Sequence, residues 1–152
     1  MKTLIAICAL ALTAAATARA EDQVRYVAAK DVGGLIAKGA LSASVPTGPG
    51  ATVLVAHRDK SGDVEIHIKV NDELVVRAGA GSVLIGPKVE GAKETAPNEF
   101  RGGTIVGGKT YPLAPGDVIW IPAGLGHQLL IPAGGTIDYL AIKFDALPAA
   151  HP

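Results

Sequence analysis

The sequence predicts an all-β protein, a double-sheet jelly-roll barrel with a short N-terminal helix. From residue 51 onward, short apolar segments alternate with turns rich in Gly, Pro, Asp and Asn, a pattern typical of a sandwich or barrel. No long amphipathic helical pattern interrupts these segments, which argues against an α/β fold. The length of this region suits a single domain.

The residues before this region have a different pattern. Val24–Ala28 predicts an edge strand, and Asp31 predicts the N-cap of a short helix over Val32–Lys38, which Gly39 ends. The segment Leu41–Gly50 is rich in Ser, Pro and Gly and predicts a connector.

The β region divides at its turn residues into nine predicted strands. They are Thr52–Ala56, Val64–Val70, Glu73–Arg77, Ser82–Ile85, Thr104–Val106, Tyr111–Leu113, Val118–Ile121, Gln128–Ile131 and Thr136–Phe144. One long stretch, Ala92–Gly103, is rich in charge, Gly and Pro and is predicted to be irregular. We expect it to cover or rim the mouth of the barrel.

The first twenty residues have the features of an export signal. Lys2 supplies a positive charge, an apolar run follows, and Ala18-Arg19-Ala20 offers a small-x-small cleavage site before Glu21. The apolar run is short for a membrane span, although an uncleaved anchor is the alternative interpretation. We therefore predict a periplasmic or secreted protein with no membrane span in the mature chain. The predicted divisions are a signal peptide at 1–20, an N-terminal strand, helix and connector at 21–50, the barrel at 51–146 and a tail at 147–152.

Composition excludes several classes of function. Removing the signal takes Cys8 with it, so thiol catalysis and disulfides are excluded from the mature chain. It also removes Lys2 and Arg19, which leaves 12 basic against 14 acidic residues and a formal charge of −2. No basic stripe is visible, so nucleic acid is not an expected partner. No Gly-x-Ser-x-Gly elbow is present, which argues against a serine hydrolase of that kind.

The most informative segment is Gly116–His127, with the sequence GDVIWIPAGLGH. Residues 118–121 predict a buried strand, and Pro122 and Gly124 predict a tight turn after it. His127 then opens a second apolar run, so it lies where two strands of a barrel meet. The alternative interpretation of His127 is a histidine hydrogen-bonded within the barrel wall.

A second segment upstream carries Glu65, His67 and Asp72. Side chains alternate along a strand, so Glu65 and His67 share one face. With His127 they form a set of two imidazoles and two carboxylates, which suits a divalent transition metal. Glu65 and His67 would otherwise form a solvated outer face, and Asp72 would otherwise be a turn residue. Glu73 would replace Asp72 if the strand register moved by one residue.

These two segments resemble the two motifs of the cupin superfamily. The family's second motif is G-x5-P-x-G-x2-H-x3-N, which Gly116, Pro122, Gly124 and His127 match in spacing, while Ile131 replaces the final Asn. The first motif is G-x5-H-x-H-x3,4-E-x6-G. In that motif, Glu65 stands at the first His, His67 at the second, Asp72 at the Glu and Gly79 at the closing Gly, while Asp59 replaces the opening Gly.

The resemblance covers about Ala51 to Phe144 and points to small single-domain bacterial cupins of the cupin 2 conserved-barrel type. It implies a double-stranded β-helix and a mononuclear metal site formed by Glu65, His67, Asp72 and His127. The two carboxylates favour Fe or Mn, with Zn or Ni as alternatives. The implied partner is a small molecule, handled by a dioxygenase-, decarboxylase- or isomerase-type reaction, and a homodimer paired through an exposed sheet is also implied.

Two further hypotheses stay open at this point. The barrel could bind metal or a small ligand without turnover, or it could be a metal-free structural module. Outside the motifs, His57 is interpreted as a solvated residue and His151 lies in the predicted tail. Glu99 and Arg101 are interpreted as a solvated loop pair, with contact to a substrate carboxylate or to each other as the alternative. Trp120 is expected outside the barrel or at an interface.

Overall fold

The structure is a computed structural model that describes residues 26–37, 42–45, 47 and 50–146. The predicted signal peptide, the start of the predicted edge strand, Gly39 and the tail lie outside the described residues. In the described part, one helix and thirteen strands occur. They are α1 (Ala29–Ala37), β1 (Ser42–Val45), β2 (Ala51–Arg58), β3 (Glu65–His67), β4 (Val70–Gly79), β5 (Gly81–Gly86), β6 (Lys88–Glu90), β7 (Lys93–Ala96), β8 (Glu99–Arg101), β9 (Thr104–Val106), β10 (Lys109–Leu113), β11 (Val118–Ile121), β12 (Gly126–Leu130) and β13 (Ile137–Asp145).

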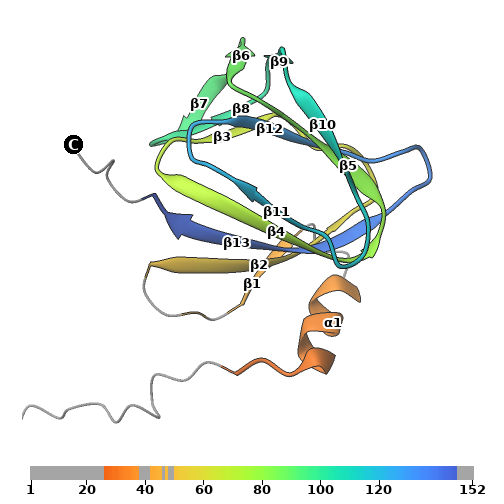
Figure 1. Cartoon of the computed structure of the whole chain (residues 1–152). Helices are drawn as coiled ribbons and strands as arrows, with labels where there is room; N and C mark the ends of the chain where they lie inside the picture. The colour runs from red at the N-terminus through yellow and green to blue at the C-terminus, as the bar shows by residue number, and fades with distance from the viewer. Residues whose placement is uncertain (1–25, 38–41, 46, 48–49, 147–152) are drawn as a thin grey trace, which may run out of the picture.

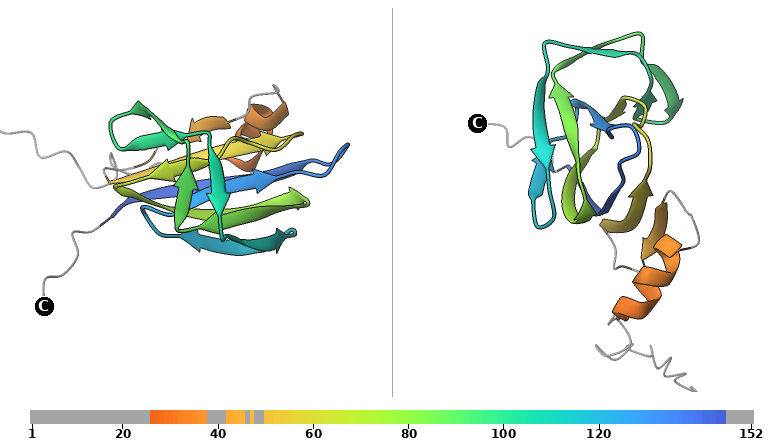
Figure 2. Two further views of the ribbon diagram at one scale, coloured as in Figure 1. Left: turned by 90° about the horizontal axis from the view of Figure 1, so that it is seen from above. Right: turned by 90° about the vertical axis from the view of Figure 1, so that its right-hand side faces the viewer.

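The strands form two antiparallel sheets that stack as the two walls of a barrel (Figures 1 and 2). The first sheet has the order β1-β2-β13-β4-β11, and the second has the order β10-β5-β12-β3-β8-β7. A separate pair, β6 and β9, projects beyond the second sheet (Figure 1). The predicted all-β jelly roll is confirmed by this arrangement.

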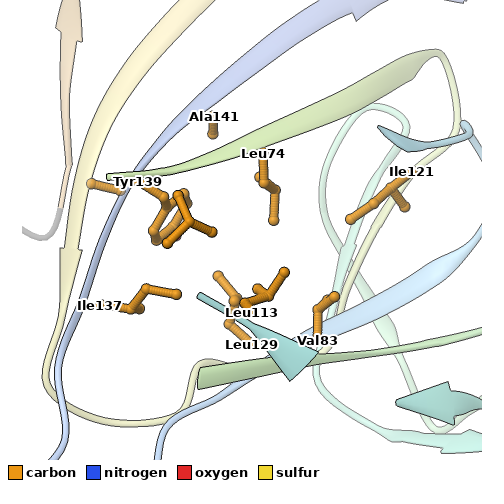
Figure 3. Close-up of a cluster of buried hydrophobic side chains, with 10 residues drawn as sticks. Leu74, Val83, Leu113, Ile121, Leu129, Ile137, Tyr139 and Ala141 are labelled. Carbon is orange, nitrogen blue, oxygen red and sulfur yellow. The ribbon is translucent and has the colours of Figure 1, made fainter. Parts of the chain in front are cut away.

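Inward-facing residues change from polar to apolar along the strands. On β4 the buried positions are Asp72, Leu74 and Val76, and on β12 the buried side chains are those of His127 and Leu129. The period of two therefore builds one polar layer above several apolar layers. Figure 3 shows the apolar layers as side chains from both sheets that meet in the interior, among them Leu74, Val83, Leu113, Ile121, Leu129, Ile137, Tyr139 and Ala141.

The N-terminal region corrects two predictions. Residues 26–28 are not a strand, and α1 begins at Ala29 because Ala29 and Lys30 are strong helix formers. Asp31 therefore lies in the first turn instead of at the N-cap. The helix packs on the outside of the barrel against β1 and β2 (Figure 1). Among the described residues, no helix is long and apolar enough to cross a membrane.

The predicted connector at 41–50 is also corrected, because it contains the edge strand β1. Its residues pair in antiparallel register with Val53–Ala56 of β2. The sequence of β1, Ser-Ala-Ser-Val, has only four residues and two serines, so its composition resembles that of a loop.

The stretch Ala92–Gly103 is a hairpin, not an irregular loop. Lys93–Ala96 forms β7 and Glu99–Arg101 forms β8, and β8 pairs with β3. The turn between them contains Asn98 with φ of 66°, a left-handed conformation that Asn tolerates better than most residues. Both short strands contain charged residues, so the sequence pattern did not predict them as strands. Pairing with β3 places β8 beside His67 and Glu65.

Two motif glycines have backbone roles. Gly79 has φ of 73°, and a Cβ added there would lie 2.0 Å from the carbonyl oxygen of Thr136. Gly124 has φ of 84°, and its N–H donates a hydrogen bond of 2.8 Å to the carbonyl oxygen of His67. This bond ties the turn of the second motif to the strand of the first motif.

Candidate metal centre

All four predicted site residues lie together at one end of the barrel interior. His67 and Asp72 are each 4% exposed and His127 is 7% exposed, whereas Glu65 is half-buried. The predicted alternative of a solvated outer face is therefore wrong for His67. Asp72 faces the barrel interior and Glu73 faces the opposite side of β4. The alternative register, in which Glu73 would replace Asp72 in the site, does not occur.

Strand register explains why these side chains meet. His127 of β12 lies directly opposite Glu65 of β3, and residues paired across antiparallel strands share a face. Asp72 of β4 lies opposite Lys143 of β13 in the other sheet. One sheet thus supplies Glu65 and both histidines, and the facing sheet supplies Asp72 and Lys143.

The spacing of the donor atoms fits one metal ion. The Nε2 atom of His67 lies 3.5 Å from Oε2 of Glu65 and 3.4 Å from Oδ2 of Asp72, which is 3.6 Å from Nε2 of His127. Donor atoms bound to one ion at about 2.1 Å lie roughly 3.0 to 3.5 Å apart in octahedral or tetrahedral geometry. Donor atoms of Glu65, His67 and His127 all lie within 4.8 Å of one another. Glu65, His67 and His127 therefore fit a mononuclear site, and Asp72 adjoins it through its contacts with both histidines.

Both histidines present the same ring nitrogen to this space. The Nδ1 atom of His67 contacts a carboxylate oxygen of Glu99, and Nδ1 of His127 lies 3.3 Å from the carbonyl oxygen of Leu125. Each acceptor favours a proton on Nδ1, so in the neutral ring the lone pair is on Nε2. Metal-binding histidines usually have a partner of this kind on the other nitrogen.

Two arginines orient Glu65. Arg101 forms an ion pair with its Oε1 atom, and Nη2 of Arg58 lies 3.6 Å from the same oxygen. Arg58 is fixed in turn by a 3.0 Å hydrogen bond from its Nε to the hydroxyl of Tyr139. Because both arginines contact Oε1, the other oxygen of Glu65 faces His67.

The electrostatic balance of the site favours charged groups. Burial opposes charge on His67, but hydrogen bonds to Asp72 and Glu65 outweigh it and raise the His67 pKa to about 9. Burial likewise opposes charge on Glu65, but the hydrogen bond from His67 and the charge of Arg101 lower the Glu65 pKa to about 2. The Asp72 pKa is also lowered, despite burial, by His67 and Lys143. Burial lowers the pKa of His127, so this ring is the neutral one.

A cavity of about 270 Å³ opens from the site into the barrel. Arg58, Arg101 and Lys143 give it positive charge near Glu65 and Asp72. Most of the remaining wall is apolar and is formed by Leu54, Ala56, Leu74, Leu129, Tyr139 and Ala141, while Ser42, Gly62 and Asp63 complete it. The pocket thus joins a charged end to an apolar end.

Several site residues were misassigned or missed in the sequence. Glu99 and Arg101 were expected to be solvated, yet β8 places them against His67 and Glu65. Lys143 could have been placed in the interior from the sequence, because it follows the buried residues of β13 at the same spacing of two. Trp120 is 49% exposed, as expected, on the outer face of its strand.

The remaining histidines lie apart from this centre. His57 is half-buried, and its Nδ1 lies 2.5 Å from the carboxylate of Asp138, so its interpretation as a solvated residue is wrong. His151 lies outside the described residues.

Known structures similar to this chain include one at moderate overall similarity. The protein BH2720 from Bacillus halodurans has a TM-score of 0.58 and 19% identity, over 84% of this chain and 83% of that one. A cupin protein from Bacteroides fragilis has a TM-score of 0.49 and 18% identity, over 74% and 83%. A Cupin 2 conserved barrel domain protein from Salinispora arenicola has a TM-score of 0.46 and 14% identity, over 69% and 75%.

The structural neighbours of this chain include cupin proteins. At these identities the likeness concerns the fold, so the chemistry of the site has to be argued from its own residues. No family model matches the sequence, and no curated protein matches it.

Proposed function

We propose that this protein is an exported cupin-type protein that binds one divalent transition metal and acts on a small molecule in the barrel. The observation that carries the proposal is the cluster of donor atoms from Glu65, His67 and His127, with Asp72 against both histidines, beside a cavity in the barrel. Export is proposed from the features of the first twenty residues, which lie outside the described part of the chain.

The donor set supports Fe or Mn as the metal, with Zn or Ni as alternatives. Two imidazoles with one or two carboxylates are the donors used by mononuclear Fe(II) sites with open positions, and carboxylates favour Mn over softer ions. When bound, such an ion would supply Lewis acidity or redox chemistry toward oxygen atoms of a ligand. The protein's own residues hold the donors in place, as Glu99 does for His67 and Arg101 does for Glu65.

The cavity indicates the kind of small molecule. Its volume of about 270 Å³ is below the range of pockets that take drug-sized ligands. Arg58 and Arg101, which pair with Glu65, line the charged side of the cavity, and Leu54 and Leu129 lie on the apolar side. We propose a compact ligand with an oxygen-bearing, preferably anionic head and an apolar body. Reactions of the dioxygenase, decarboxylase or isomerase type suit such a ligand.

Metal content is the direct test. We expect about one equivalent of Fe or Mn in the mature protein purified without a His tag, and we expect His127→Ala to lose it while keeping the β circular dichroism spectrum. His57→Ala is the matched control, because His57 is a half-buried strand histidine that contacts Asp138 outside the site. Wild-type metal content in the His127→Ala variant would rule out the assignment.

A second outcome concerns turnover. If metal is bound and small carboxylic acids stabilise the protein without being consumed, the protein is a metal-dependent binding module. If oxygen or the acid is consumed in a metal-dependent way, the protein is an enzyme.

A further inference from the structure

The ammonium group of Lys143 lies in the same space as the proposed metal. Its Nζ atom donates hydrogen bonds of 2.7 and 2.8 Å to the two oxygens of Asp72 and lies 3.0 Å from Nε2 of His67. These partners are two of the four proposed metal ligands. A metal bound to both would take up the donor atoms that Lys143 contacts, so the two cations compete for the same positions.

We propose that Lys143 is an internal cation that holds the metal position in the metal-free protein and is displaced when metal binds. This inference rests on the proposed function, because it concerns the same donor atoms. It gives Asp72, 4% exposed, a cationic partner inside the barrel. A buried carboxylate with no partner would be strongly destabilising, and Lys143 provides that partner from the adjacent strand.

The structure also offers space for the displaced side chain. Lys143 lines the central cavity and also a second cavity of about 200 Å³ at the strand ends of β2, β4 and β13. That second cavity is lined by Thr52, Val70 and the carboxylate-bearing Asp145. Asp145 lies two residues along β13 on the same face, so a rotated Lys143 finds a negative partner close to water.

The consequence is a reduced affinity for metal. Binding must first break the contacts of Lys143 with Asp72 and His67, and charge-assisted hydrogen bonds of this kind are worth enough to change an equilibrium by tenfold or more. Lys143 therefore lowers the affinity of the site, so that only an ion that binds both Asp72 and His67 strongly enough to displace it occupies the site.

The test is a titration of metal-stripped protein with Mn²⁺ alone and with Zn²⁺ alone, by calorimetry. Lys143→Gln removes the positive charge but keeps a donor near Asp72, and Lys143→Met removes both. Lys60→Gln is the control, because it removes one charge from an exposed turn. We expect Lys143→Gln to bind metal at least about tenfold more tightly than the wild type, and Lys60→Gln to be unchanged.

Each outcome decides the proposal. Unchanged or weaker binding by Lys143→Gln, with metal bound by the wild type, would overturn the role of Lys143 and leave the metal site intact. Metal binding by Lys143→Gln but not by the wild type would support the proposal and would mean that Lys143 excludes the ion completely. Absence of binding in both proteins would overturn the proposed function and this inference together. If Lys143→Met unfolds when stripped, the Lys143→Gln result stands by itself.

Discussion

Raising the pH should destabilise the metal-free protein through His67. In the unfolded chain a histidine titrates near 6.5, whereas the folded site raises the His67 pKa to about 9. Between these values the folded state keeps a proton that the unfolded state has released. The contribution of His67 to the free energy of unfolding is therefore fully present below pH 6.5 and is lost as the pH rises through 9.

The magnitude follows from the separation of the two pKa values. Each unit of separation corresponds to about 1.4 kcal/mol, so the free energy of unfolding should fall by at most about 3 kcal/mol across this window. Urea unfolding at several pH values from 6 to 9, with a chelator present, measures it directly. The chosen range stays below the ordinary titration of lysine and tyrosine.

A His67→Gln variant separates this effect from others. Gln does not titrate, so its free energy of unfolding should be nearly level over the same range. Excess Mn²⁺ should also abolish the fall in the wild type, because a metal-bound imidazole carries no proton on the bound nitrogen. A wild-type curve that is level, or a His67→Gln curve that falls as steeply, would refute the electrostatic account of the site.

Two further predictions concern positioning and the backbone. Glu99→Gln should weaken metal binding about tenfold and Glu99→Ala more, because Glu99 fixes the ring of His67. Calorimetry measures these affinities, and the exposed control Glu90→Gln should bind metal as the wild type does. Equal affinities in all of these proteins would refute the role of Glu99. Gly79→Ala should cost more than about 2 kcal/mol in urea unfolding, since it combines a positive φ with a backbone clash. Gly134→Ala has φ of 73° but no atom nearby, so it should cost only about 1 kcal/mol, and equal losses would show that the clash relaxes freely.

The parts of the fold with strong local patterns were predictable from the sequence. Val118–Ile121 was predicted with the bounds that the structure has, because four apolar residues end at a proline and a glycine. The prediction that this strand is buried was wrong, since β11 is an edge strand that exposes Val118 and Trp120. His67 and His127 could be placed together because strand alternation and the motif spacing both constrain them. Their burial agrees with this prediction, since both are less than 10% exposed.

Other parts depended on partners that are distant in sequence. The hairpin of β7 and β8 has charged residues that resemble a loop, and only its pairing with β3 makes Glu99 and Arg101 part of the site. Lys143 comes 71 residues after Asp72, and no local pattern connects them. Cross-strand neighbours of this kind are fixed by sheet register, which a single sequence does not specify.

The origin of the donor atoms in two facing sheets has a mechanical consequence. Asp72 belongs to one wall of the barrel, and His67 and His127 belong to the other. An ion held by all three would act as a rivet between the walls, so any separation of the sheets at this end would have to break metal–ligand bonds. Metal binding would then increase the free energy needed to separate the two sheets. Hydrogen exchange along β4 and β12 would slow together when the ion binds.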